Sequence, residues 1–270
     1  MLTKSQKNHF HEEGYLMVPG MVPDDLCDAV IEAILEYSSI DMDDESTWCD
    51  RDVDGHGIIP LHHDQALWDL RQCPALHQVF SDLYETDDLW VSNDRVSCKS
   101  PTAEQSRDWH RERIHWDCDP WTYDQLSMQG LVYLTDTDKD QGAFSCVPSI
   151  FKNLKRYLVE HEADGHRRYP NVGDEDLVRV AGPKGSLVIF NRLMPHTSDL
   201  NHSDQHRFVQ YVTMAPAVEK LRKQVVREWR EKLLPDWALS QAISGGKVKE
   251  EGPPPELTDL GRKLVGLDRW

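Results

Sequence analysis

A histidine and an aspartate stand two positions apart in the aromatic-rich stretch RIHWDCDPWTY, residues 113–123. Along a β-strand, side chains at i and i+2 point to the same face, so a strand here would offer His115 and Asp117 to one metal ion. A third ligand would complete a set of two histidines and one carboxylate, which suits non-haem Fe(II) and its oxygen chemistry. The chain has 13 histidines, so the spacing alone leaves open whether this pair binds metal or lies on a solvated strand.

Histidines farther along the chain are candidates for the third ligand. The stretch GPKGSLVIFNRLMPHTSDL predicts a turn, a buried strand at 187–190 and a loop that carries His196. A residue just beyond a strand end is held by a rigid element and still faces a cavity, which favours His196. His202 and His206 follow in the same polar loop, where we expect solvated side chains.

Two other pairs have the spacing of a histidine and a carboxylate two positions apart. His62 and Asp64 border the predicted helix 66–84, where side chains at i and i+2 diverge, so we interpret them as a helix N-terminal region. His110 and Glu112 lie in an arginine-rich stretch without apolar alternation, which we assign to a loop over the site. The pair in RIHWDCDPWTY therefore remains the favoured one.

The elements that position these residues change in type along the chain. The sequence predicts a short helix that Gly14 ends, a strand at 15–18, a helix that starts near Pro23 with acids in its first turn, and an amphipathic helix at 66–84. From about residue 88, short β-rich segments alternate with turns and polar loops. These segments are LWVSNDRVSCKS, MQGLVYLTD, AFSCVP, GSLVIFN and RFVQYVTMA.

Helices first and strands later indicate a mainly β core with helices packed outside it. We expect one domain over residues 1–270, with N-terminal helices at about 3–84 and a β core at about 88–216. A helix at 217–233, the linker SGGKVKEEGPPPE and a closing segment form the rest, 217–270.

Composition limits the partners. The net charge of −17 argues against nucleic acid and anionic membranes, and a mean hydropathy of −0.62 without a long apolar run argues against a membrane span. Arg107, Arg111 and Arg113 could bind one small anion or form a solvated rim. Six scattered cysteines without a C-x-x-C pair, and a first segment without an apolar run, predict a cytoplasmic protein with reduced thiols.

The order of the motifs resembles the phytanoyl-CoA dioxygenase family of Fe(II)- and 2-oxoglutarate-dependent oxygenases. FHEEGYLMVPGMV, HWD, GLVYLTDTDKDQGAFSCVPSIFK and GSLVIFNRLMPHTSDLNHSDQHRF carry the resemblance, over residues 9–216. It implies a double-stranded β-helix (jelly-roll, cupin-like) core and an Fe(II) ion bound by His115, Asp117 and His196. Where the family often has GxLxxxPGSHK, this chain continues from Pro148 with SIFK, so the G-S-H step is absent and the substrate-side loop is expected to differ.

The same resemblance implies a site for 2-oxoglutarate. The family loop H-x-S-x-x-N-x-S-x-x-x-R places Ser198 and Arg207 in this chain, and the arginine there grips the distal carboxylate with help from the serine. A guanidinium offers the planar pair of donors that a carboxylate accepts. Tyr133 is expected on a strand, where it faces either the cosubstrate or the core.

The implied reaction is hydroxylation of a C–H bond of a small molecule, with 2-oxoglutarate and O2 converted to succinate and CO2. Related halogenases have a small residue in place of Asp117, so an aspartate favours hydroxylation, while desaturation and ring closure stay open. Aromatic residues near the ligands could form a wall or a cage for a cation, or belong to the core. The residues predicted to line the substrate pocket are Asn93, Lys99, Trp109, Arg113, Trp116 and Trp121.

Two alternatives come from other classes. A cupin-like metalloenzyme that does not use 2-oxoglutarate would keep its activity in Arg207→Ala. A jelly-roll ligand-binding protein would keep its ligand affinity in His115→Ala. If His115, Asp117 and His196 bind Fe(II), Cys118 follows a metal ligand in the sequence and is expected on the opposite face of the strand, away from the iron.

Overall fold

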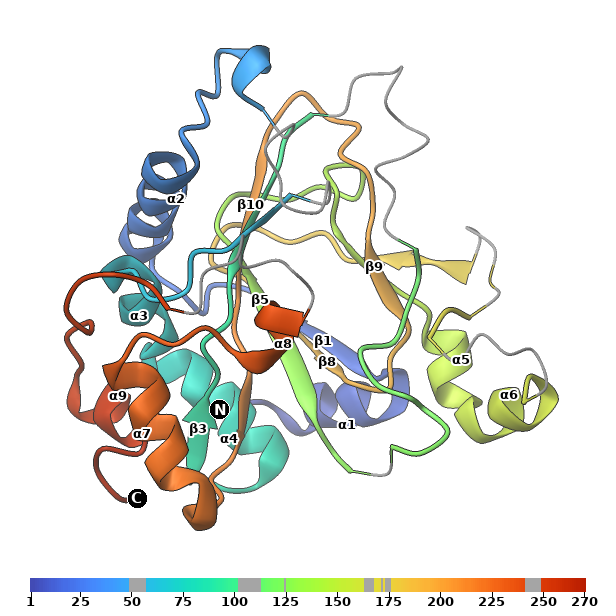
Figure 1. The fold of residues 1–270 in the computed structure, drawn as a ribbon. Helices are drawn as coiled ribbons and strands as arrows, with labels where there is room; N and C mark the ends of the chain where they lie inside the picture. Colours follow the sequence, from blue (N-terminus) through green and yellow to red (C-terminus); the bar gives the residue numbers. More distant parts are fainter. Residues whose placement is uncertain are drawn as a thin grey trace.

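Antiparallel β-sheets occupy the centre of the molecule, and helices cover them on the outside (Figure 1). The computed structural model describes residues 1–48, 57–101, 113–123, 125–162, 168–170, 172, 176–240 and 249–270. The prediction of a mainly β core with flanking helices is confirmed for these residues.

The N-terminal elements follow the predicted order. Helix α1 (Lys4–Glu13) ends at Gly14, whose φ of 80° is readily adopted only by glycine. Strand β1 (Tyr15–Val18) and helix α2 (Asp24–Ser38) follow, and two aspartates in the first turn of α2 suit the positive end of the helix dipole. Strand β1 precedes the β core expected at about 88–216, but it belongs to the same sheet because it pairs with β8 (Leu187–Asn191).

The prediction of one helix at 66–84 is wrong, because two helices occupy this stretch. Helix α3 (Gln65–Arg71) ends shortly before Pro74, and α4 (Pro74–Tyr84) begins there. Proline lacks the N–H that a continuous helix would need and is well accommodated in a first turn. Asp64 caps α3 by accepting a hydrogen bond from the backbone N–H of Ala66 at 2.8 Å, which confirms that this stretch is a helix start.

Strands that lie far apart in the sequence form the sheets of the described residues. The largest has the order β1-β8-β5-β10-β4-β2, and two smaller ones have the orders β7-β6-β9 and β11-β3. The remaining strands are β2 (Ile58–Ile59), β3 (Leu89–Val91), β4 (Val96–Lys99), β5 (Met128–Tyr133), β6 (Phe144–Cys146), β7 (Val178–Arg179), β9 (His196–Ser198), β10 (Arg207–Tyr211) and β11 (Met214–Pro216).

The two faces of the six-stranded sheet pack against different parts of the molecule. Leu187 and Ile189 of β8 belong to a large hydrophobic cluster that includes residues of α2, α3 and α4. Val188 and Phe190 point to the opposite face and pack with Phe144 of the three-stranded sheet. This alternation leaves the space between the two sheets available for a site.

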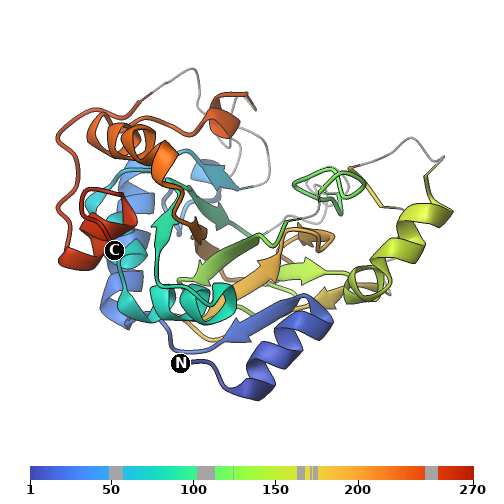
Figure 2. The same ribbon diagram turned by 90° about the horizontal axis from the view of Figure 1, so that it is seen from below.

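The C-terminal segment adds helices at one end of the molecule. Helix α7 (Arg222–Arg230) and α9 (Asp259–Leu264) lie at the end opposite α5 (Pro148–Lys152) and α6 (Leu154–Glu160), as Figures 1 and 2 both show. The helix predicted at 217–233 is shorter than expected, because a 3-10 turn precedes it. Among the described residues, no helix combines the length and the apolar character needed to cross a membrane.

Candidate active site

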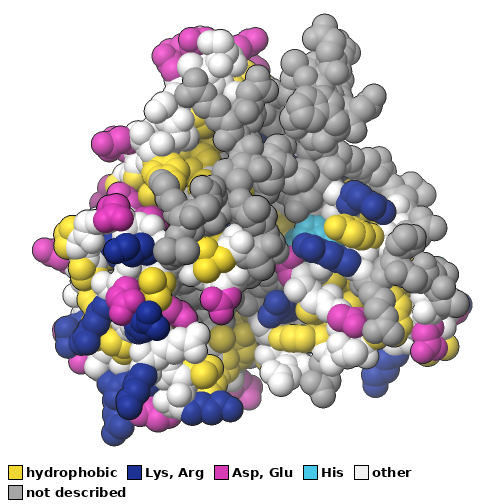
Figure 3. Space-filling view, viewed as in Figure 1, with side chains coloured by type: hydrophobic (Ala, Val, Ile, Leu, Met, Phe, Trp, Pro, Cys, Tyr) yellow, Lys and Arg dark blue, Asp and Glu magenta, His cyan; other side chains and the backbone are white. Residues whose placement is uncertain are grey.

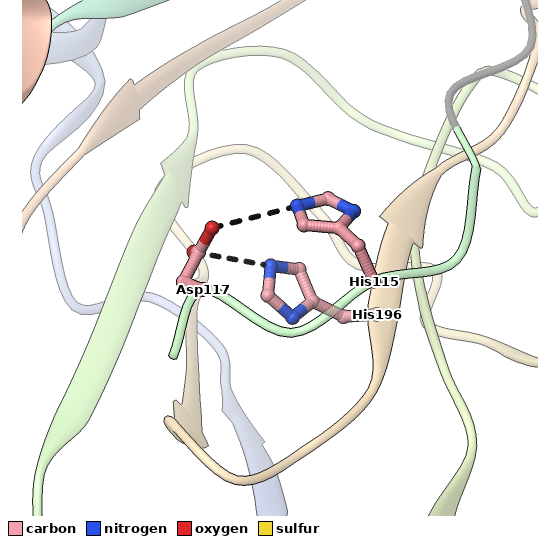
Figure 4. Close-up of side chains that lie close together, drawn as sticks. All are labelled: His115, Asp117 and His196. Carbon is pink, nitrogen blue, oxygen red and sulfur yellow. Dashed lines mark ion pairs between the residues drawn. The ribbon is translucent and has the colours of Figure 1, made fainter. Parts of the chain in front are cut away.

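The three predicted metal ligands lie together (Figure 4). Nε2 of His115 lies 3.5 Å from Oδ1 of Asp117, and Nε2 of His196 lies 3.5 Å from Oδ2. One ligand atom from each of the three residues falls within 4.8 Å of the others. Two imidazole nitrogens and one carboxylate oxygen at this spacing can hold one metal ion and leave further coordination positions open.

Backbone hydrogen bonds set the distance between the two histidines. The N–H of His115 donates to the carbonyl of His196 at 2.9 Å, and the N–H of His196 donates back at 3.0 Å. The predicted strand over 115–117 is reduced to this single bridge, and Asp117 follows it in a bend. The loop predicted to carry His196 is instead the short strand β9, because it pairs with β6 as well.

Each histidine is oriented by its second ring nitrogen. Nδ1 of His115 lies 2.8 Å from the carbonyl of Arg113, and Nδ1 of His196 lies 3.0 Å from the carbonyl of Met194. A carbonyl accepts, so Nδ1 carries the proton, and Nε2 is left free to coordinate a metal ion.

The carboxylate of Asp117 is held by its neighbours. Burial raises the pKa of Asp117, but the contacts with His115 and His196 outweigh burial and keep the pKa below its ordinary value. Gln129 donates from Nε2 to Oδ2 at 2.9 Å, and Arg192 donates from Nη2 to the Asp117 backbone carbonyl at 3.1 Å. The carboxylate is therefore ionised and held in a fixed position, as a metal ligand would need to be.

The triad lines a cavity of about 90 Å³ between the six-stranded and three-stranded sheets. Figure 3 shows this side of the molecule, where a histidine surface lies between basic and hydrophobic side chains. Besides the triad, the cavity is lined by Ile58, Asp94, Arg95, Gln129, Gly130, Leu131, Phe144, Phe190, Thr197, Ser198, Arg207, Tyr211 and Thr213.

Arg207 is a buried cation in this cavity. It is 1% exposed, and its Nη1 donates to the carbonyl of Gly142 at 2.9 Å and to Oγ of Ser198 at 3.1 Å. Its Nη2 donates to Oγ of Ser97 at 3.0 Å. These partners are neutral oxygens, and Nε has no hydrogen-bond partner among the described residues. A buried positive charge without a charged partner is unfavourable, and binding of an anionic ligand beside it would remove this cost.

Tyr133 and Lys99 stand behind the cavity. The Tyr133 hydroxyl donates to the carbonyl of Val180 at 2.7 Å and accepts from the N–H of Phe144 at 3.0 Å. Tyr133 is therefore a core residue that joins two backbone segments, rather than one that faces a cosubstrate. Lys99 donates to the carbonyls of Ser198 and Asp199 at 2.6 and 2.7 Å, so it holds the end of β9, where Ser198 lies.

Two members of the predicted aromatic wall, Trp116 and Trp121, do not line the cavity. Trp116 is 1% exposed, packs with Val147 and Ile150, and donates from Nε1 to the carbonyl of Leu193 at 2.8 Å. Trp121 meets the Trp116 ring edge-on at 6.2 Å. Trp116 therefore turns into this small core, while His115 and Asp117 on either side of it line the cavity.

The other predicted substrate residues also lie elsewhere or outside the described residues. Arg113 is exposed and stacks on Tyr169 at 4.4 Å, and the backbone carbonyl of Asn93 accepts from His62. Neither lines the cavity. The predictions for Trp109, Arg107, Arg111, His110 and Glu112 fall outside the described residues.

The prediction that His206 is solvated is wrong. Its side chain is buried, with Nδ1 3.8 Å from Sγ of Cys98 and the ring 4.6 Å from the Trp48 ring, edge to face. His202 is exposed as expected. Cys118 directs its thiol to the carbonyl of Arg192 at 3.6 Å and does not line the cavity, as its place next to Asp117 predicted.

Several residues of the site were not predicted. Ser97, which accepts a hydrogen bond from Arg207, is a polar residue in the strand sequence VSCK. The same signal drew attention to Lys99, so Ser97 could have been found. Arg95 lies 5.0 Å from the Tyr211 ring centre, and Gln129 precedes Gly130 on β5. Nothing in the sequence near Gln129 indicates that it reaches Asp117, because the contact depends on the fold.

Comparison with known proteins identifies the family. The sequence model for "Phytanoyl-CoA dioxygenase (PhyH)" matches residues 10–209. The chain belongs to this family. A Dictyostelium discoideum protein whose name assigns it to the phytanoyl-CoA dioxygenases is 22% identical over 258 residues, which covers 77% of this chain and 74% of that protein.

Solved structures of similar fold include enzymes of the 2-oxoglutarate-dependent class. The non-haem α-ketoglutarate-dependent carbocyclase SnoK from nogalamycin biosynthesis has a TM-score of 0.51 at 18% identity, over 96% of this chain and 95% of that one. The epimerase SnoN, solved with Fe3+, α-ketoglutarate and nogalamycin RO, has a TM-score of 0.54 at 13% identity, over 95% and 96%. The family and these neighbours support an enzyme of the non-haem iron and 2-oxoglutarate class.

Proposed function

We propose that this protein is an Fe(II)- and 2-oxoglutarate-dependent dioxygenase that hydroxylates a C–H bond of a small molecule. The balance is one substrate C–H, one O2 and one 2-oxoglutarate converted to one C–OH, one succinate and one CO2. The observation that carries the proposal is the buried Arg207, without an anionic partner among the described residues, in the cavity that the His-Asp-His group lines. We further propose that the two larger sheets form the double-stranded β-helix of this enzyme class.

The roles of the side chains follow from their positions. His115, Asp117 and His196 would hold Fe(II), and Arg207 with Ser198 would bind the distal carboxylate of 2-oxoglutarate. When bound, the iron and 2-oxoglutarate would supply the oxygen activation. The protein would supply the anchor at Arg207 and would orient the cosubstrate beside the metal.

The substrate would enter at the opposite end of the cavity. Arg207 and Tyr211 lie on the same face of β10, four residues apart, and both line the cavity. A strand rises about 3.3 Å per residue, so the two positions are about 13 Å apart. With Arg207 assigned to 2-oxoglutarate, Asp94, Arg95, Tyr211 and Thr213 would contact the substrate.

An anaerobic titration of the apo protein with Fe(II) and then 2-oxoglutarate tests the proposal. The weak visible charge-transfer band of iron-bound 2-oxoglutarate should appear, should weaken in Arg207→Ala and should be lost in His196→Ala. Iron binding without the band would favour the cupin-like alternative. Failure to bind iron would favour a jelly-roll ligand-binding protein.

The two structural neighbours are named as a carbocyclase and an epimerase, so enzymes of this fold catalyse reactions other than hydroxylation. The reaction outcome therefore needs its own test. Succinate release would be used to screen small molecules, and mass spectrometry of the product would separate the outcomes. Hydroxylation adds 16 mass units as one oxygen atom, whereas ring closure or desaturation removes two hydrogens. A product of unchanged mass would contradict the hydroxylase assignment.

A further inference from the structure

Gln129 connects the wall of the cavity to the metal site. It lies on β5, two residues before Leu131, and both side chains line the cavity. Its Nε2 is 2.9 Å from Oδ2 of Asp117. Gln129 thus contacts a proposed metal ligand, although it belongs to neither the H-x-D motif nor the distal loop.

The chemistry of the contact fixes the orientation of the amide. An ionised carboxylate only accepts hydrogen bonds, so the amide must present its NH2 group to Asp117. The Gln129 carbonyl oxygen, Oε1, is buried and has no hydrogen-bond partner among the described residues. Rotating the amide would place this oxygen against the Asp117 carboxylate, which is unfavourable, so one orientation is selected.

The hydrogen bond distinguishes the two oxygens of Asp117. Oδ1 lies beside His115, whereas Oδ2 lies beside His196 and also accepts from Gln129. A lone pair of Oδ2 engaged by an N–H is less available to a cation. The Arg192 bond to the Asp117 backbone carbonyl restrains the same residue from the other side.

On the basis of the proposed function, we propose that Gln129 is a positioning residue that holds Asp117 as a ligand through Oδ1 alone. A single-oxygen ligand leaves one more coordination position for the cosubstrate and O2 than a carboxylate bound through both oxygens. Gln129 acts through Asp117 and does not itself bind the metal.

The test uses Co(II) as the probe, because its visible absorption reports coordination number and geometry. Gln129→Met keeps the approximate length and volume of the side chain but removes the donor. We expect Co(II) affinity to fall about 10-fold to 100-fold, the range usual for loss of a hydrogen bond to a metal ligand. At saturating Co(II), the visible spectrum should also change, because Asp117 is then free to bind through both oxygens.

Gln210→Met is the matched control. Gln210 is a buried glutamine on the neighbouring strand β10, donates from Nε2 to the carbonyl of Leu67 at 2.8 Å and does not line the cavity. It should bind Co(II) with native affinity and spectrum. Circular dichroism of both apo variants checks folding, and Gln129→Asn, whose amide is too short to reach, replaces Gln129→Met if the latter does not fold.

The inference would be overturned if Gln129→Met kept the native Co(II) affinity and visible spectrum. It would also be overturned if Gln210→Met lost as much Co(II) affinity as Gln129→Met. Either result would leave the dioxygenase proposal standing. If the native protein itself bound no Co(II) and no Fe(II), the dioxygenase proposal would fail instead. The two failures are therefore distinguishable in one set of titrations.

Discussion

Arg207 is fully buried, and its hydrogen-bond partners among the described residues carry no negative charge. Gly142, Ser198 and Ser97 supply only neutral oxygens. These contacts fix the plane of the guanidinium before any ligand arrives, which lowers the entropy cost of binding a planar carboxylate.

Arg207→Lys tests whether the planar pair of donors matters in addition to the charge. Lysine keeps the positive charge but cannot donate two parallel hydrogen bonds. A hydrogen bond to a charged group contributes about 1.5–3 kcal/mol, so 2-oxoglutarate affinity should fall about 10-fold to 100-fold. Isothermal titration of the Fe(II)-loaded protein measures this affinity. Arg227→Lys is the control, because Arg227 is exposed and pairs with Glu231, and this variant should bind 2-oxoglutarate with native affinity. Equal affinity in Arg207→Lys would contradict the assigned role.

Gly142 has a conformation and surroundings that a larger residue would disturb. Its φ is +67°, and an added Cβ would lie 3.1 Å from the Asp199 carbonyl oxygen. Gly142→Ala should cost about 1–2 kcal/mol of unfolding free energy from the backbone alone, and should weaken 2-oxoglutarate binding because its carbonyl holds Arg207. Gly20→Ala is the control, since Gly20 has a φ of +65° with no atom within 4 Å of an added Cβ. Urea denaturation should show the greater loss in Gly142→Ala.

At the scale of elements, the C-terminal segment holds the loop before α3. Glu250 accepts from the backbone N–H of His62 at 2.5 Å and of His63 at 3.0 Å. His63 in turn lies 2.9 Å, through Nε2, from the carbonyl of Leu233. Two stretches almost 190 residues apart in the sequence are thus joined behind the strand that carries Ser97.

Glu250→Ala should weaken this junction. Two N–H groups would lose their acceptor, at a cost of about 1–3 kcal/mol each, so we expect a loss of about 2–6 kcal/mol in unfolding free energy. Glu251→Ala, at an exposed neighbouring position, should be within about 0.5 kcal/mol of native. Urea denaturation of both variants measures the difference, and a loss in Glu250→Ala no larger than in Glu251→Ala would refute the role of the carboxylate.

Local sequence signals predicted the elements that are formed by periodicity or by caps. The strands around Val188 and Val209 and the end of α1 at Gly14 needed only such signals. The burial of His206 and the reduction of the His115 strand to one bridge could not be predicted, because they depend on which distant segments pack there. For the site, the H-x-D spacing and the distal loop predicted the triad and Arg207, whereas Gln129 required the fold.

At the scale of the whole molecule, buried neutral histidines couple stability to pH. Burial lowers the pKa of His62 to about 4 and of His63 to about 3. The unfolded values lie near 6.5, so the unfolded chain binds more protons below that pH, and stability falls as the pH falls. Arg71 and Lys232 add to this effect on His63, while burial raises the pKa of Glu250 and opposes it.

The expected loss is up to about 1.4 kcal/mol per pH unit for each histidine between pH 6.5 and 4. Urea denaturation at pH 7.5 and pH 5 measures it. His63→Gln, which keeps a donor for the Leu233 carbonyl, should lose stability less steeply between these values. An unchanged slope in His63→Gln would show that another group controls the acid response.

Metal binding should also stabilise the whole fold. An ion that binds only the folded state adds about 2.7 kcal/mol at a concentration 100 times its Kd. We therefore expect Co(II) to raise the melting temperature of the native protein, and to leave that of His196→Ala unchanged. A similar rise in both proteins would place the ion at another site.

The reciprocal backbone bonds between His115 and His196 have a consequence for how the protein would acquire the proposed metal ion. They set the separation of the two imidazoles through the main chain, so the ligands are in place before any ion arrives. Folding then does not select the ion, and the tendency of divalent metals to bind such nitrogen and oxygen ligands rises from iron to copper. The metal ion that occupies the site would then depend on which free metal ions surround the folded protein. A chelator should remove the ion without unfolding the protein, and the site should then bind metal again.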